Sequence, residues 1–94
     1  MNNYQLVVTS KFKKDARRAL KRGKNVRKLD EAIDRLLAGE SLPESMRDHE
    51  LVGNYAGHRE CHIEPDWLLI YRIDHGHLIL TAVRTGTHSD LFGE

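Results

Sequence analysis

The feature that most constrains the fold is an almost continuous apolar run, WLLIYRI, at residues 67–73. A short apolar segment bounded by turn residues is typical of a strand that is buried on both faces. Pro65 and Asp66 precede the run in positions that suit a tight turn, and the sequence DHG at residues 74–76 predicts a second turn. The chain is therefore expected to fold around a central strand that has a neighbour on each side.

The segments on either side of this run are predicted to be its neighbouring strands. RECHIE, residues 59–64, alternates so that Cys61 and Ile63 share one face while Glu60 and His62 share the other. HLILTAVR, residues 77–84, predicts the strand that follows the second turn. The C-terminal half should thus form an antiparallel meander of three or more strands.

The N-terminal part shows helical periodicity after one short strand. YQLVVT, residues 4–9, alternates as a strand does, and Ser10 then suits the N-cap of a helix that ends at Gly23. A second helix precedes Gly39, and residues 39–57 have no clear period, so we expect an ordered loop there leading to a short strand. The apolar positions of the two helices are Phe12, Ala16, Ala19 and Leu20, then Val26, Leu29, Ile33, Leu36 and Leu37.

Together these elements predict an α+β fold in a single domain, residues 1–94. It has a strand, two N-terminal helices packed on a twisted antiparallel sheet of about four strands, and a short C-terminal segment. No apolar run approaches the roughly 20 residues needed to cross a bilayer, and the first residues lack the pattern of a signal peptide. The lone Cys61 has no disulfide partner within the chain, so we expect a cytoplasmic protein without a membrane partner.

Charge is distributed unevenly along the chain. Residues 1–37 hold eleven Lys or Arg against four acids, a net charge of +7, whereas the remainder holds four Arg against ten acids, a net charge of −6. This polarity indicates either a polyanionic partner on the basic side or a solvated helix face. If the partner is RNA, the helix KFKKDARRALKR should contact its phosphates through Lys11, Lys13, Lys14, Arg17, Arg18, Lys21 and Arg22.

Titratable side chains gather around the predicted sheet. His62 lies on the strand face opposite Ile63, and Asp66 occupies the turn that closes the same hairpin. Arg84 ends the last strand, and His88 follows it closely in the segment TGTHSDLF. Another histidine comes from the loop sequence RDHEL, at residue 49. We expect these groups to converge on one rim of the sheet.

The sequence DHELVGNYAGHRECHIEPDWLLIYRI, followed by RTGTHSDLF, resembles the YafQ-type branch of the RelE superfamily of bacterial toxins. These toxins are the mRNA-cleaving halves of toxin–antitoxin pairs, and the resemblance covers essentially the whole chain. It implies a RelE-like fold and an endoribonuclease that cuts mRNA in the ribosomal A site. The partners it implies are an antitoxin, held in a toxin–antitoxin hetero-oligomer, the ribosome with its rRNA, and mRNA.

The resemblance also implies roles for particular residues. The acid/base group falls on His49, His62, Asp66 and His88, with Arg84 as the phosphate-binding arginine and Trp67 and Phe92 as flanking aromatics. One departure from the family pattern is Tyr55, where a bulkier aromatic side chain is common.

This set of residues suits RNA cleavage on chemical grounds. RNA supplies its own nucleophile, the 2′-hydroxyl, so cleavage needs a base, an acid for the leaving 5′-oxygen and positive charge on the phosphate. Histidine serves proton transfer near neutral pH, and an arginine binds two phosphate oxygens while keeping its charge. No metal or cofactor is therefore expected. His88, close to Arg84, is the favoured acid, and the base or orienting partner is one of His49, His62 and Asp66.

Alternatives remain open for several residues and for the function. Trp67 and Phe92 can pack the core instead of stacking on bases, and Cys61 is expected to be buried rather than nucleophilic. The histidines with Asp66 could also form a zinc site, although their spacing matches no common metal motif. The alternative functions are a non-catalytic toxin of the same fold that poisons gyrase, and a plain RNA-binding module.

Overall fold

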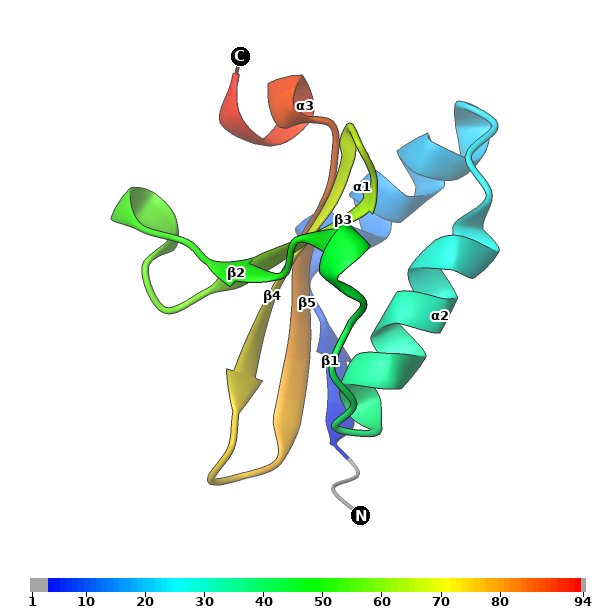
Figure 1. Cartoon of the computed structure of the whole chain (residues 1–94). Coiled ribbons are helices and arrows are strands. Elements are labelled where there is room, and N and C mark those ends of the chain that lie inside the picture. Colours follow the sequence, from blue (N-terminus) through cyan, green and yellow to red (C-terminus); the bar gives the residue numbers. More distant parts are fainter. Residues whose placement is uncertain (1–3, 94) are drawn as a thin grey trace.

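In the computed structural model, which describes residues 4–93, the chain forms a five-stranded mixed sheet (Figure 1). The strand order across the sheet is β1-β5-β4-β3-β2. Within the described residues, β1 runs parallel to β5 and the other three pairings are antiparallel. The strands are β1 (Gln5–Val8), β2 (His49–Glu50), β3 (Arg59–Glu64), β4 (Trp67–Asp74) and β5 (Ile79–Gly86).

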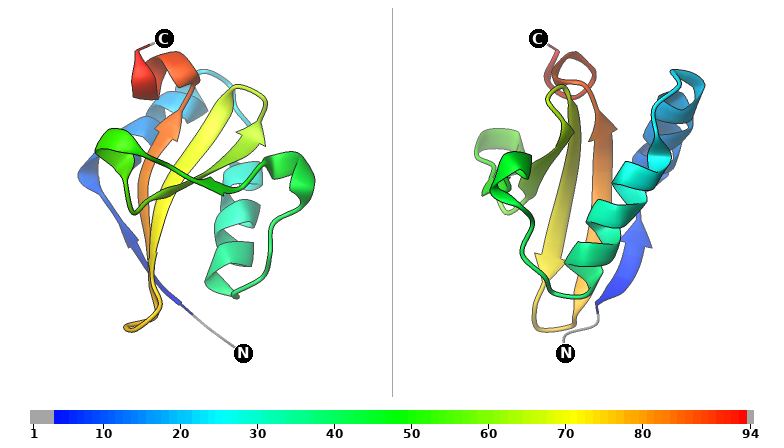
Figure 2. Two further views of the ribbon diagram at one scale, coloured as in Figure 1. Left: turned by 60° about the vertical axis from the view of Figure 1, so that its left-hand side comes forward. Right: turned by 45° about the vertical axis from the view of Figure 1, so that its right-hand side comes forward.

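The helices α1 (Ser10–Lys21) and α2 (Val26–Leu37) cover one face of this sheet, which we call the helix face (Figure 2). Side-chain caps start both helices: the Thr9 hydroxyl accepts from the Phe12 amide, and the Asn25 side chain accepts from the Arg27 amide. The predicted N-cap, Ser10, is off by one residue: Thr9 is the N-cap and Ser10 is the first residue of the helix. Gly23, with a φ of 80°, follows the end of α1 as predicted.

The main core lies between these helices and the sheet. It includes Cys61, Trp67 and Leu69 from β3 and β4, packed against apolar residues of α1 and α2. The apolar face of α2 agrees with the prediction, whereas Leu20 of α1 is 60% exposed, and Asp15 occupies a buried position on that helix. Cys61 is fully buried, as expected, and burial raises the pKa of its thiol to about 12.

The opposite face of the sheet, which we call the site face, is covered only by short elements (Figure 2). They are η2 (Gly53–Tyr55) and α3 (His88–Phe92), and a smaller cluster of Leu68, Ile70 and Leu91 packs beneath them, whereas Met46 of η1 (Glu44–Met46) packs against the main core. A capping box starts α3, in which Thr87 and Asp90 each accept from the other's backbone amide. This box fixes the segment that carries His88.

The fold class is confirmed, with two differences of detail. The sheet has five strands rather than about four, and it is mixed because β1 pairs in parallel with β5. The last strand begins at Ile79 rather than at residue 77, because Leu78 has a φ of 54° and belongs to the turn. The loop of residues 39–57 holds η1, β2 and η2, in agreement with an ordered loop that leads into a short strand.

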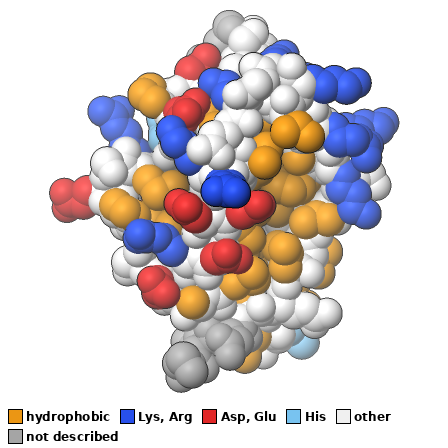
Figure 3. Space-filling view, turned by 90° about the vertical axis from the view of Figure 1, so that its right-hand side faces the viewer, with side chains coloured by type: hydrophobic (Ala, Val, Ile, Leu, Met, Phe, Trp, Pro, Cys, Tyr) orange, Lys and Arg blue, Asp and Glu red, His pale blue; other side chains and the backbone are white. Residues whose placement is uncertain are grey.

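An apolar groove remains open at the outer side of α1, α2 and β1. Figure 3 shows hydrophobic side chains gathered on this side of the molecule beside basic ones. The residues lining the groove include Leu6, Val8, Phe12, Ala16 and Ile33. None of the helices in residues 4–93 is long and apolar enough to cross a membrane.

Candidate active site

The pairing of three strands brings the polar residues of the site face into two rows. Glu60 of β3 is paired with Ile70 of β4, which is paired in turn with Arg84 of β5. Directly paired residues point to the same face of a sheet, so Glu60 and Arg84 share the site face, roughly 10 Å apart across two strand spacings. The second row, from His62 through Leu68 to Gly86, leads directly into α3.

Three histidines from distant parts of the chain, carried by β2, β3 and α3 (Figure 1), lie close together. The ring centroids of His62 and His88 are 5.7 Å apart, and those of His49 and His62 are 6.4 Å apart. The side chain of His62 is 15% exposed, whereas those of His49 and His88 are 49% and 40% exposed. The predicted convergence of these three residues is therefore confirmed as geometry.

Asp66 holds His88 at two points. Its Oδ1 atom accepts a hydrogen bond from the His88 backbone amide at 2.9 Å and lies 2.7 Å from Nδ1 of the same residue. The amide and then the imidazole lower the pKa of the Asp66 carboxyl, which therefore stays ionised at neutral pH. Because an ionised carboxylate only accepts hydrogen bonds, Nδ1 of His88 donates to it and Nε2 is directed to other partners.

Glu60 joins the cluster, although the sequence pattern did not single it out as a site residue. Its Oε2 atom lies 3.2 Å from Nε2 of His49 and 3.8 Å from Nε2 of His62. The side chain is only 6% exposed, and its other oxygen, Oε1, has no hydrogen-bond partner among the described residues. The signal was present in the strand pattern, since Glu60 and His62 are two residues apart and must share a face.

Arg84 reaches the edge of the sheet and pairs with Asp15 of α1. Its Nε lies 2.6 Å from Oδ2, and its Nη2 lies 3.1 Å from Oδ1. The hydrogen bonds that Arg84 donates to Asp15 raise the pKa of the guanidinium, and Tyr55 adds a smaller contribution in the same direction. Tyr55 also meets Phe92 edge to face, with ring centroids 6.0 Å apart. Arginine, tyrosine and phenylalanine thus form the side of the site nearest β5.

The two aromatic residues expected to flank RNA have different environments. Trp67 is 1% exposed, belongs to the main core and donates from Nε1 to the Thr85 hydroxyl at 3.0 Å. Its assignment as a substrate-binding residue does not fit this burial, and core packing is the interpretation that the structure supports. Phe92 is 37% exposed and remains accessible beside Tyr55.

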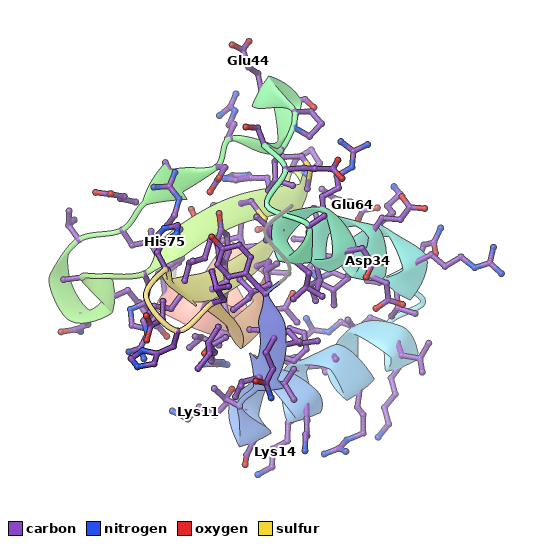
Figure 4. The ribbon with its side chains drawn as sticks, turned by 90° about the horizontal axis from the view of Figure 1, so that it is seen from below. Lys11, Lys14, Asp34, Glu44, Glu64 and His75 are labelled. Carbon is purple, nitrogen blue, oxygen red and sulfur yellow. The ribbon has the colours of Figure 1, made fainter. Side chains whose placement is uncertain are left out.

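The basic residues of α1 fall into two groups. Arg18 and Arg22 lie beside Asp90 of α3, at 3.6 and 2.7 Å, so they are engaged within the chain. The other five are exposed and form no ion pair within the described residues, and Figure 4 shows two of them, Lys11 and Lys14, extending away from the fold. We call this group the basic ridge; it consists of Lys11, Lys13, Lys14, Arg17 and Lys21.

A hollow of about 460 Å³ adjoins the histidines. It is lined by η1 and by the end of β3, including Arg47, His62 and Glu64. Within residues 4–93, no group of three or more His, Cys, Asp or Glu side chains is arranged to hold a metal ion. His75 and His77 lie apart, at the turn between β4 and β5 (Figure 4), whereas His58 meets the ring of Tyr55 with centroids 5.7 Å apart.

Comparisons with known proteins agree on one family. Residues 4–93 match the family described as the bacterial toxin of a type II toxin–antitoxin system, YafQ. The mRNA interferase toxin YafQ of Escherichia coli is 40% identical over 86 residues, which cover 90% of this chain and 91% of that protein. A crystal structure of YafQ from the same species superposes with a TM-score of 0.90 at 36% identity, covering 97% of this chain and 100% of that one. The crystal structure of the E. coli DinJ–YafQ toxin–antitoxin complex gives a TM-score of 0.88 at 37% identity, covering 97% and 99%.

Proposed function

Because this chain belongs to the YafQ family of bacterial type II toxins, we propose that it is an mRNA interferase that cuts mRNA in the A site of the ribosome. The observation that carries this proposal is the cluster of three histidines on the site face, with His88 held by Asp66. Imidazoles held at fixed positions next to an arginine are what acid/base cleavage of RNA requires.

The reaction we propose uses the 2′-hydroxyl of the RNA as the nucleophile. A base removes its proton, the oxygen attacks the adjacent phosphorus, and the 5′-oxygen of the next nucleotide leaves with a proton from the acid. The products are a 2′,3′-cyclic phosphate and a 5′-hydroxyl. Every step moves a proton or exchanges one phosphorus–oxygen bond for another, so the chemical step needs no metal.

His88 is the proposed general acid. The Asp66 carboxylate accepts from Nδ1 and fixes the ring with Nε2 directed away from Asp66, so that Nε2 can deliver a proton to the leaving oxygen. The backbone bond from His88 to Asp66 holds the same residue at a second point. The acid is therefore oriented before substrate binds.

The base comes from the pair His49 and His62. Nε2 of His49 and Nε2 of His62 both lie within 4 Å of Oε2 of the buried Glu60 side chain, which keeps the two rings close together on the site face. His62 lies closer to His88 and is the less exposed of the two, which supports it as the base with His49 as its neighbour. Arg84 then stabilises the negative charge on the phosphate oxygens.

The basic ridge is the proposed contact with ribosomal RNA. It lies on the outer face of α1, whereas the histidines lie on the opposite face of the sheet, so that one molecule can bind rRNA and mRNA at once. Such a contact depends on the attraction between Lys or Arg side chains and RNA phosphates, and it does not require base recognition. This arrangement supports activity on the ribosome rather than on free RNA.

We also propose that an antitoxin silences the toxin, as DinJ accompanies YafQ in the E. coli complex. The net charge of +7 on residues 1–37 favours an antitoxin segment that is acidic and folds on contact. Co-expression with the small open reading frame next to its gene should yield a complex that co-purifies with the toxin. Harmless high-level expression of the toxin alone would argue against the proposal.

One assay separates the candidate functions. The purified protein is incubated with mRNA on intact ribosomes, with the same mRNA free in solution, and with gyrase and supercoiled DNA. We expect cleavage only of the ribosome-bound mRNA. Binding to both RNA samples without cleavage would identify an RNA-binding module, and inhibition of gyrase alone would identify a binding toxin.

A further inference from the structure

The buried carboxylate of Asp15 is not part of the reaction proposed above. Asp15 is the one acidic residue in α1, and its side chain is only 4% exposed. A buried carboxylate destabilises the fold unless its charge is paired and its oxygens accept hydrogen bonds. Asp15 accepts four: two from Arg84, one from Arg18 Nη2 at 2.9 Å and one from the Thr85 amide at 3.2 Å.

The position of Asp15 on α1 explains how it contacts Arg84, which extends from the site face. Strand β1 covers the edge of β5 only as far as the pair of Val8 and Ala82. Beyond that point α1 covers the edge, so Asp15 accepts from the Thr85 amide that a longer β1 would have paired. Arg84 starts from the site face and extends to this edge, where its guanidinium meets the carboxylate.

The geometry leaves part of the guanidinium available for a phosphate. Asp15 takes one N–H of Nε and one of Nη2, which are two of the five that an arginine carries. Both N–H groups of Nη1 and the second one of Nη2 form no hydrogen bond with Asp15. One N–H of Nη1 and this second N–H of Nη2 form the end-on pair of donors that suits two phosphate oxygens. Arg84 can therefore bind Asp15 along one edge and a phosphate along another.

We propose that Asp15 is a positioning residue of the nuclease site, which holds the guanidinium of Arg84 in the orientation that the scissile phosphate needs. The inference rests on the proposed function. A free arginine loses the freedom of several bonds when it binds a phosphate, whereas one held by Asp15 has lost it during folding. Because less conformational entropy is lost when the phosphate binds, both the binding of RNA and the rate of cleavage increase.

The ion pairs of Asp15 also connect it to the segment that carries His88, the proposed general acid. Arg18 bridges Asp15 and Asp90, with its Nη2 at 2.9 and 3.6 Å from the two carboxylates. Asp90 belongs to the capping box of the helix that begins with His88. One helix, α1, thus anchors both the phosphate-binding arginine and the segment that carries the general acid.

A double-mutant cycle tests the proposal by measuring single-turnover cleavage of ribosome-bound mRNA. Asp15→Asn keeps the size of the side chain but removes its charge, and it should slow cleavage by about 10- to 100-fold. In an Arg84→Gln background the same change should cost less than about 3-fold, because Asp15 acts through Arg84. An equal loss in both backgrounds would overturn the proposal and leave Asp15 a purely structural role.

Two controls separate positioning from reduced stability. Ile33→Val shortens a core side chain of α2 far from the site, so it lowers the free energy of unfolding and should leave cleavage by the folded protein unchanged. Arg84→Lys keeps the charge but cannot bind Asp15 and a phosphate along two edges, so it should lose nearly as much rate as Arg84→Gln. A fully active Arg84→Lys variant would contradict the need for orientation.

A measurement without substrate distinguishes this inference from the proposed function. The Nε–H proton of Arg84, bonded to Asp15, should give a resolved ¹H–¹⁵N NMR signal that Asp15→Asn abolishes. If the wild-type protein shows this signal but cleaves no mRNA, the proposed function fails while the Asp15 contact stands. A signal that survives Asp15→Asn would refute the positioning role directly.

Discussion

At His88, one carboxylate oxygen determines both where the ring sits and which nitrogen faces outward. Oδ1 of Asp66 lies within hydrogen-bond distance of the backbone amide and of Nδ1 of the same histidine. Such a two-point contact holds a general acid in place with few residues, although both side chains are well exposed. The proposed acid therefore depends on local geometry and not on burial.

His88→Ala should separate chemistry from binding. The variant should bind ribosomes like the wild type and lose a factor of about 100 to 10,000 in single-turnover cleavage, the usual range for a general acid. His77→Ala is a matched control, because His77 is exposed at the turn between β4 and β5, away from the cluster. Full cleavage activity in both His88→Ala and Asp66→Ala would exclude this assignment.

At the same scale, the sequence predicted the histidines and Asp66 of the site better than the residues that contact them. His49, His62, Asp66 and His88 converge as expected, because strand alternation and turn position already constrain them. Asp15 was not predicted to join the site, since its contact with Arg84 connects residues 69 positions apart, which no local pattern reveals. An acid at an apolar position of a basic helix was the available signal.

At the scale of elements, α3 is a short helix whose position depends on polar contacts. It has five residues, and Asp90 accepts from the Thr87 amide at 3.0 Å while pairing with Arg22 at 2.7 Å. Isolated helices of this length are not stable in water, so the cap and the ion pair decide whether His88 stays in place. The hydrogen bond from Arg22 lowers the pKa of Asp90 well below its usual range.

Asp90→Asn should therefore lower the free energy of unfolding by about 1 to 2 kcal/mol at pH 7. The pKa of Asp90 is lower in the folded than in the unfolded chain, so its stabilisation is complete above the unfolded value of 3.8 and is lost as the pH falls through the folded pKa. Denaturant unfolding of both proteins between pH 7 and about pH 2 checks this. The difference in free energy of unfolding between the two proteins should decrease only at acidic pH. A difference that is constant across the range would contradict the stabilising role of the Asp90 carboxylate.

The basic ridge of α1 permits a second prediction at this scale. Replacing Lys13, Arg17 and Lys21 with Gln should weaken ribosome binding and reduce its dependence on salt, by roughly 0.7 to 0.9 in log–log slope for each phosphate interaction that is removed. Arg27→Gln with Arg35→Gln on α2 is the control, since it removes exposed charges from another helix. If the slope does not change, the ridge faces solvent or the antitoxin instead.

Element boundaries could be predicted where the local signal was strong. The buried strand of residues 67–73, the N-cap of α1 and the glycines that follow the helices agree with the structure to within one or two residues. The parallel pairing of β1 with β5 was missed, because it joins strands more than 70 residues apart and depends on how the helices cross the sheet. The start of β5 was missed because an apolar residue, Leu78, adopts a left-handed turn conformation.

At the scale of the whole molecule, two kinds of surface lie on opposite sides of one sheet. The helix face carries the basic ridge, and the site face carries the histidines and Arg84. The uneven charge seen in the sequence thus corresponds to a proposed division between binding and chemistry. The ion pairs of Asp15 and Asp90 connect the two sides through α1.

Acid/base attack by the 2′-hydroxyl leaves chemical ends on the RNA that other cleavage routes do not, so the ends of the product decide whether this molecule works as proposed. The wild-type protein is incubated with mRNA on intact ribosomes, whose own magnesium is kept, with and without a zinc-selective chelator, and the new ends are mapped. We expect a 2′,3′-cyclic phosphate and a 5′-hydroxyl in both samples. A 5′-phosphate product, or loss of cleavage with the chelator, would contradict the proposed chemistry.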